Sequence, residues 1–187
     1  MARHAVLRGH RERALVLALG VIVSASGCLP GADINAKSGA GNGDGKGYHH
    51  ALLTNVRHAV HAEEDGFDRV VFDFLNNVPN WEVSYVDKPV VEDGSGEPVP
   101  LAGDFALKVR MSPASQVFFT PASPSGIIDL YPGPGRITTG YPQVTEIVDT
   151  GDFEAVATWH IGTRTKVPFR VQVLDSPHRL VIDVAHA

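Results

Sequence analysis

Apolar and polar residues alternate with a period of two in many short segments after Tyr48. In the segment FDRVVFDF, which spans residues 67–74, Phe72 and Phe74 fall on the same face. The segments at 167–173 and 179–185 alternate in the same way. Because successive side chains of a strand point to opposite faces, this pattern predicts strands with one buried face.

The same reasoning predicts further strands, bounded by turn residues. These strands cover residues 53–61, 81–86, 105–111, 144–148 and 153–161. Clusters of Gly, Pro, Asn and Asp separate the segments at 64–66, 76–80, 92–96, 150–152 and 175–177. No segment has a sustained apolar stripe with helical spacing. The chain is therefore predicted to be all-β, an antiparallel sandwich or a small barrel.

The stretch from Ser112 to Pro142 does not fit a simple series of hairpins. It holds six prolines and four glycines together with Phe, Ile, Leu and Tyr residues. A connection of this length is usually functional or without fixed structure. We expect part of it to pack on the sheets as a short edge strand or helical turn, and residues 131–136 to form a rigid exposed loop.

The first 27 residues have the order of a secretory signal. Four arginines surround a polar stretch, the ten-residue apolar run Ala14 to Val23 follows, and small residues come next. A helix needs about 20 apolar residues to cross a bilayer, so a permanent transmembrane helix is not expected. The sequence predicts a signal peptide at 1–27, a Gly-rich linker at 28–47 and one folded domain at 48–187.

Cys28 is the only cysteine, which excludes an intramolecular disulfide. It follows Ala25-Ser26-Gly27, and this sequence resembles the lipobox of bacterial lipoproteins, although the first position is Ala in place of the commoner Leu. The resemblance implies lipidation of Cys28 and anchoring by acyl chains to the outer face of the cell membrane. The alternative is an ordinary signal-peptidase site, with Cys28 as the new N-terminus.

The predicted mature chain is acidic. Without residues 1–27 it keeps 12 basic and 20 acidic side chains, a formal charge of −8 with neutral histidines. Such a charge disfavours binding to nucleic acid and simple electrostatic adhesion to anionic lipid. Any hold on the membrane is therefore expected to come from the acyl chains.

The sequence contains no established catalytic motif, such as a GxSxG elbow, an HExxH pair or a phosphate-binding loop. His58 and His61 fall on opposite faces of a predicted strand, which argues against a metal site. Asp73 and Asp183 could form a carboxylate pair of the kind that hydrolases use, but surface pairing with neighbouring arginines is the preferred interpretation. We expect neither a cofactor nor a metal, and no enzymatic activity.

Four aromatic residues are candidates for ligand binding, because exposed rings pack against the apolar faces of sugars. Trp81 and Tyr85 share one face of a predicted strand, and Tyr131 and Tyr141 lie in the Pro/Gly-rich stretch, where we expect exposure. Core positions are the alternative for Trp81 and Tyr85. Trp159 lies in an apolar pattern and is predicted to be in the core.

Four segments together resemble the AMIN-like domain of secreted bacterial proteins. They are LLTNVRHAVH, FDRVVFDF, GDFEAVATWHIG and PFRVQVLDSPHRLVIDV, between Leu52 and Val184. The resemblance implies an all-β antiparallel sandwich. It also implies a role in the cell envelope, since AMIN domains accompany cell-wall amidases and secretion components and are thought to bind peptidoglycan or other envelope material.

The sequence therefore leads to one main functional prediction with two alternatives. The main prediction is a non-catalytic, lipid-anchored module that contacts peptidoglycan or other cell-wall material. The first alternative is a lipoprotein that recruits an envelope enzyme or transporter through a sheet edge or the 112–142 stretch. The second is a hydrolase with an unrecognised carboxylate site.

Overall fold

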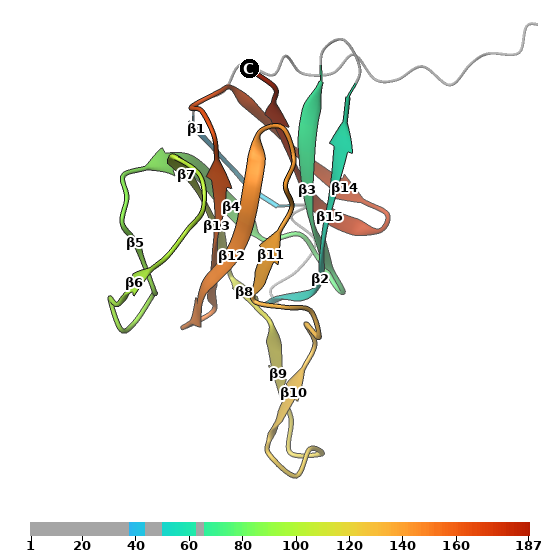
Figure 1. Ribbon diagram of the computed structural model, residues 1–187. Helices are drawn as coiled ribbons and strands as arrows, with labels where there is room; N and C mark the ends of the chain where they lie inside the picture. The colour runs from blue at the N-terminus through green and yellow to red at the C-terminus, as the bar shows by residue number, and fades with distance from the viewer. Residues whose placement is uncertain (1–37, 44–49, 63–65) are drawn as a thin grey trace, which may run out of the picture. The chain divides into compact units, whose positions relative to one another are not determined.

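The alternating segments pair into two sheets that pack face to face, as the computed structural model shows (Figure 1). The structure describes residues 38–43, 50–62 and 66–187. Across the larger sheet the strands are β1 (Ser38–Gly41), β4 (Asn80–Val86), β7 (Phe105–Ser112), β13 (Val156–Thr163), β12 (Val144–Phe153) and β11 (Arg136–Thr138). Across the smaller sheet they are β14 (Phe169–Asp175), β15 (His178–Ala185), β3 (Phe67–Phe74), β2 (Ala51–His61) and β8 (Ala114–Ser115).

The predicted all-β sandwich is confirmed. Neighbouring strands are antiparallel except for β2 and β8, which pair in parallel through Ala51 and Leu52. Two short hairpins complete the fold, and their strands are β5 (Val90–Val91) with β6 (Pro98–Val99) and β9 (Val117–Phe119) with β10 (Ile127–Asp129). The sandwich arises because each sheet has one apolar face that must be covered.

The inner faces of the two sheets share one apolar core. Trp159 of β13 is fully buried, as predicted, and its ring meets Phe72 of the opposite sheet with 5.9 Å between centroids. Tyr131 packs edge-on against the same indole at 5.5 Å. A second contact between the sheets joins Tyr85 and Phe169 at 6.1 Å. Edge-to-face geometry at these separations is favourable for aromatic pairs.

The predicted position of one turn was wrong. Residues 150–152 were predicted to form a turn, but they continue β12 through a bulge between Asp149 and Gly151. The turn lies at Glu154 and Ala155, whose φ angles of 50° and 61° suit a tight hairpin. Thr150 is buried and its hydroxyl donates to the carbonyl of Thr158, so the hydroxyl is satisfied within the sheet.

The segment between β4 and β7 covers the outer face of the larger sheet. Val90 and Leu101 of this segment form a second, small apolar cluster with Ala106 and Val148 of the sheet. His160 shares that face, because its register partner in β12 is Val148. Its ring is only 3% exposed and hydrogen-bonds to the hydroxyl of Thr150 at 2.9 Å.

Burial makes His160 a source of pH-dependent stability. Desolvation, together with the nearby positive charge of Lys108, lowers its pKa from 6.5 to about 4, and Asp93 offsets this only in part. Between these two values the unfolded chain binds a proton that the folded chain does not. The free energy of unfolding therefore falls as the pH drops from about 6.5 to about 4.

The variant His160→Gln is expected to lose this contribution. Urea unfolding midpoints at about pH 7 and about pH 4.5 should differ less for the variant than for the parent chain, because glutamine does not titrate. The same difference in both proteins would show that His160 is not the source of the pH dependence.

Candidate functional site

A surface pocket of about 490 Å³ lies where β1, β4 and β7 meet. Its lining has amide, hydroxyl and charged groups, contributed by Asn42, Asn80, Glu82, Arg110 and Ser112, and it also includes Trp81. Neighbouring residues of β4 and β7 supply most of the polar groups, since Asn80 pairs with Ser112 and Glu82 with Arg110. A few convergent polar groups are typical of the part of a small-molecule site that orients the ligand.

The ring of Trp81 lies on the inner face of the sheet, where it packs against the core and next to the glycines of β1. Gly41 is its register partner, and a Cβ atom on Gly41 would lie 2.7 Å from Cζ2 of the indole. Gly39 is also close, at 3.2 Å from the ring. Only a strand of very small residues can therefore lie over this ring. β1 comes from the segment that was predicted to be a linker.

Several polar atoms of the pocket are not engaged within the described residues. The indole Nε1 of Trp81 is buried and has no hydrogen-bond partner there. Arg110 is partly buried and Glu82 exposed, and neither side chain has an ion pair or hydrogen bond to another described residue. A ligand could satisfy the guanidinium of Arg110 without displacing a contact between described residues, whereas the indole N–H lies on the inner face of the sheet.

The other three aromatic candidates are held by contacts within the fold. Tyr85 is partly buried, and its hydroxyl donates to the carbonyl of Val167 at 2.9 Å. Burial raises the pKa of Tyr85, so the hydroxyl stays protonated and able to donate. Tyr141 is also partly buried, and its hydroxyl hydrogen-bonds to Nδ1 of His58 at 2.9 Å.

Tyr131 is not exposed, contrary to the prediction. Only 5% of its surface is accessible, because the ring packs on Trp159 in the core. Its hydroxyl donates to the carbonyl of Pro134, and Gly133 must lack a side chain because a Cβ atom there would come within 2.5 Å of the ring. The 131–136 loop is thus anchored to the core by its first residue.

Tyr131 lies beside a smaller pocket of about 290 Å³ with aspartates in its lining. Two of these aspartates accept hydrogen bonds from residues nearby in the fold. Asp152 accepts hydrogen bonds from the Ser115 hydroxyl and the Gln116 N–H. Asp149 accepts from the side chain of Gln116 and the N–H of Gly151, and burial raises its pKa. Both carboxylates therefore have hydrogen-bond donors within the fold and give no reason to assign a ligand to this pocket.

The carboxylate pair considered from the sequence is not a catalytic arrangement. Asp183 is fully buried and accepts two hydrogen bonds from Arg69, at 2.6 and 2.9 Å, and two from Arg170, at 3.1 and 2.5 Å. Asp73 is bound in the same two-pronged way by Arg57. The pairing with arginines was predicted, but its location at the surface was wrong for Asp183.

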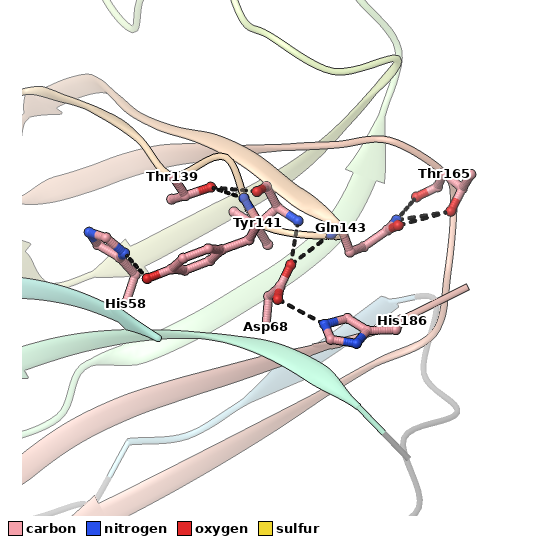
Figure 2. Close-up of polar contacts among 8 residues, drawn as sticks. His58, Asp68, Thr139, Tyr141, Gln143, Thr165 and His186 are labelled. Carbon is pink, nitrogen blue, oxygen red and sulfur yellow. Dashed lines mark hydrogen bonds and ion pairs between the residues drawn. The ribbon is translucent and has the colours of Figure 1, made fainter. Parts of the chain in front are cut away.

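One polar network was missed by sequence analysis (Figure 2). Asp68 of β3 is fully buried, and one of its oxygens accepts hydrogen bonds from the backbone N–H groups of Gln143 and Val144 at 2.8 and 2.7 Å. The other oxygen lies 2.8 Å from Nε2 of His186. These bonds join β3 of the smaller sheet to the start of β12 in the larger sheet. No hydroxyl or thiol of the described residues hydrogen-bonds to His186, so this part of the network has no nucleophile.

The remaining sequence predictions concern metal, membrane and Cys28. The described part of the chain brings no three His, Cys, Asp or Glu side chains together that could hold a metal ion. No helix that could cross a membrane is found among the residues that the structure describes. Cys28 lies outside those residues.

The family model of the AMIN-like domain matches residues 51–186. The chain belongs to the AMIN-like family. AMIN-like domains are modules of the cell envelope and generally bind without catalysing a reaction. Searches of curated proteins and of solved structures found no match. The matched region includes Trp81 and Arg110 but not β1, which completes the pocket.

Asp68→Ala is expected to lower the free energy of unfolding by about 3 kcal/mol, because it leaves two buried backbone N–H groups without acceptors. Asp87→Ala is the matched control, since Asp87 is exposed and should change stability by less than about 0.5 kcal/mol. Denaturant unfolding measures both. Equal effects in the two variants would contradict the assigned role of Asp68.

Proposed function

We propose that this AMIN-like protein is a non-catalytic module that binds peptidoglycan through the pocket at Arg110 and is held at the outer face of the cell membrane by lipid on Cys28. The observation that carries the binding proposal is the polar lining of the pocket: the guanidinium of Arg110, which has no partner among the described residues, together with the amide of Asn80 and the hydroxyl of Ser112. Family membership supports the envelope setting.

The chemistry of the pocket suits a glycan that carries peptides. Amide and hydroxyl groups hydrogen-bond to sugar hydroxyls and orient them. Asn80 and Ser112 provide such groups on the same face of the sheet as Arg110. A guanidinium binds carboxylates in a two-pronged geometry, and peptidoglycan has carboxylates on its muramic acid and its stem peptides.

The structure lowers the weight of the four aromatic candidates. Tyr85 and Tyr141 would have to give up hydrogen bonds to Val167 and His58 before contacting a ligand through their hydroxyls. Tyr131 has its ring against Trp159 and its hydroxyl on Pro134, and Trp81 has its ring against the core. We therefore place the contact at Arg110, and keep Trp81, Tyr85, Tyr131 and Tyr141 as supporting residues.

Anchoring is proposed from the sequence around Cys28. The small residues Ala25-Ser26-Gly27 precede the cysteine and follow an apolar run, as in a lipoprotein signal. Two acyl chains give stable membrane attachment, since each buried methylene contributes about 0.8 kcal/mol. The acidic chain itself would not adhere electrostatically to anionic lipid.

Wall binding is tested with the purified chain and insoluble peptidoglycan from which proteins and other wall polymers have been removed. The parent chain is expected to sediment with the wall, and Arg110→Ala should reduce the bound fraction by about tenfold, which corresponds to about 1.4 kcal/mol. Arg164→Ala is the matched control, because this substitution removes the same charge at an exposed residue that follows the end of β13. No sedimentation of the parent chain would contradict wall binding and favour recruitment of an envelope protein.

Cys28→Ser is expected to release the protein from the membrane fraction into the soluble envelope fraction or the medium, because serine cannot form the thioether to lipid. Fractionation of cells that produce the parent or variant chain measures this. Unchanged membrane retention of the variant would contradict the lipid anchor.

A further inference from the structure

The β9–β10 hairpin extends beyond the ends of both sheets, and it carries large apolar side chains that the fold does not cover (Figure 1). In register, Phe119 lies opposite Ile127 and Phe118 opposite Ile128. Opposed residues share a face and successive residues alternate, so each face of the ribbon carries one apolar pair. The exposed fractions are 71% and 42% for the first pair and 46% and 42% for the second.

An apolar pair on each face restricts what can cover the hairpin. A flat protein surface would bury one pair and leave the other in water. An exposed apolar surface of this kind usually marks a contact with a partner or a membrane. The occupant must therefore surround the ribbon, as a lipid interface does or as a deep cleft would.

The hairpin also carries no charge apart from that of Asp129, the last residue of β10, at its base. From Ser112 to Ile128 the sequence has no Asp, Glu, Lys, Arg or His, although one fifth of the whole chain is charged. An uncharged segment can leave water without the large desolvation cost of an ionised group. The absence of Lys and Arg also means that anionic lipid is not needed for attraction.

Backbone groups at the tip are satisfied within the tip itself. The N–H groups of Thr120, Ala122, Ser123 and Gly126 all donate to acceptors between residues 120 and 126. Pro121 and Pro124 have no N–H to satisfy. Unsatisfied backbone groups are the main obstacle to placing irregular chain in a lipid environment, and this tip has few unsatisfied donors.

Two serines occupy the edge of the hairpin that a partner strand would need. The carbonyl of Ile127 lies within hydrogen-bond distance of the Ser123 and Ser125 hydroxyls, at 2.8 and 2.9 Å. The N–H of Ile127 donates to the Ser125 hydroxyl. Strand addition uses such edge groups, so their occupation favours lipid over a strand-adding protein.

Two further exposed residues lie near the base of the hairpin. Leu75 is 63% exposed, and its N–H donates to Leu52, the register partner of Ser115 in β8. Phe153 is 58% exposed at the β12–β13 turn, where the Ala155 carbonyl accepts the N–H of Ala114. Both therefore flank β8, from which the hairpin emerges.

We propose that the β9–β10 hairpin is a membrane-contact element that inserts its four apolar side chains into the interface of a lipid bilayer. Insertion is driven by apolar burial and does not require anionic lipid. This contact is separate from the pocket at Arg110 and from Cys28, so it does not depend on either proposal above.

The test places a fluorescent reporter on the hairpin of the full chain. Phe119→Trp is compared with Phe105→Trp, because Phe105 is also exposed but lies at the opposite end of β7. Each variant is mixed with phosphatidylcholine vesicles, with and without brominated acyl chains. The parent chain supplies the background emission of Trp81 and Trp159, and circular dichroism verifies that each variant is folded.

Insertion of the hairpin predicts a blue shift and at least about twofold quenching by brominated lipid for the tryptophan at position 119, with neither effect at position 105. The result should be unchanged at high salt. No shift at position 119 while the chain is bound to vesicles would overturn the proposal. Equal effects at both positions would also overturn it, because they indicate adhesion that is not specific to the hairpin.

A second variant tests the role of the serines. Ser123→Ala with Ser125→Ala, in the Phe119→Trp chain, makes the tip more apolar but leaves the N–H and carbonyl of Ile127 unsatisfied. We expect weaker quenching for this reason. Stronger quenching would overturn the assigned role of the two hydroxyls.

A photoreactive benzoylphenylalanine at position 119 in intact cells distinguishes lipid from a protein partner as the occupant. Crosslinks to lipid would support the proposal. Crosslinks to a protein without any to lipid would overturn it and make the hairpin a protein-docking element.

Discussion

The packing of Trp159 between the two sheets is the contact on which the fold depends. Each sheet has an apolar face that is unstable in water, and this indole, which is inaccessible to solvent, meets Phe72 of the opposite sheet and Tyr131 of the long connection. The connection between β7 and β12 is therefore fixed at its middle by a core contact. Because Tyr131 is fixed, the hairpin before it and the loop after it leave the sandwich at defined positions.

Buried charges add directional constraints that apolar packing lacks. Asp183 binds Arg69 and Arg170 on neighbouring strands, and Asp68 binds the start of β12 from the other sheet. Removing one partner of such a buried group is costly, whereas replacing the whole group with apolar residues can be neutral. We infer that the Asp183 pairs fix the register of neighbouring strands and that the Asp68 contacts fix the position of one sheet on the other.

The strands could be predicted where one face alone is buried. The range of β3 agrees with the alternating segment at 67–74, because Arg69 and Asp73 mark its outer face, whereas Asp68 is a polar exception on the inner face. The prediction of a turn at 150–152 was wrong because Gly and Asp occur in β-bulges as well as in turns, and Thr150 is buried. The burial of Tyr131 could not be predicted from a Pro/Gly-rich stretch. The pocket and the Asp68 network depend on residues far apart in the chain, such as Asp68 and His186, and local patterns do not contain that information.

Two surfaces of the sandwich have different chemistry. The pocket at Arg110 offers polar and charged groups, which suit a glycan with carboxylates, whereas the hairpin is apolar on both faces and carries one charged residue, Asp129, at its base. The pocket is central to the proposed function, and NMR signals from the pocket and from the core allow a direct measurement. Glu82 and Arg110 line the pocket and Trp159 is in the core, so the amide signals of the first two report on the site and the indole signal of Trp159 reports on the fold. In a titration of the isotope-labelled chain with a soluble muropeptide, our account predicts a saturable shift of the Glu82 and Arg110 amide signals and a constant Trp159 indole signal. Amide signals that do not move at saturating muropeptide, or that move together with the Trp159 signal, would contradict it.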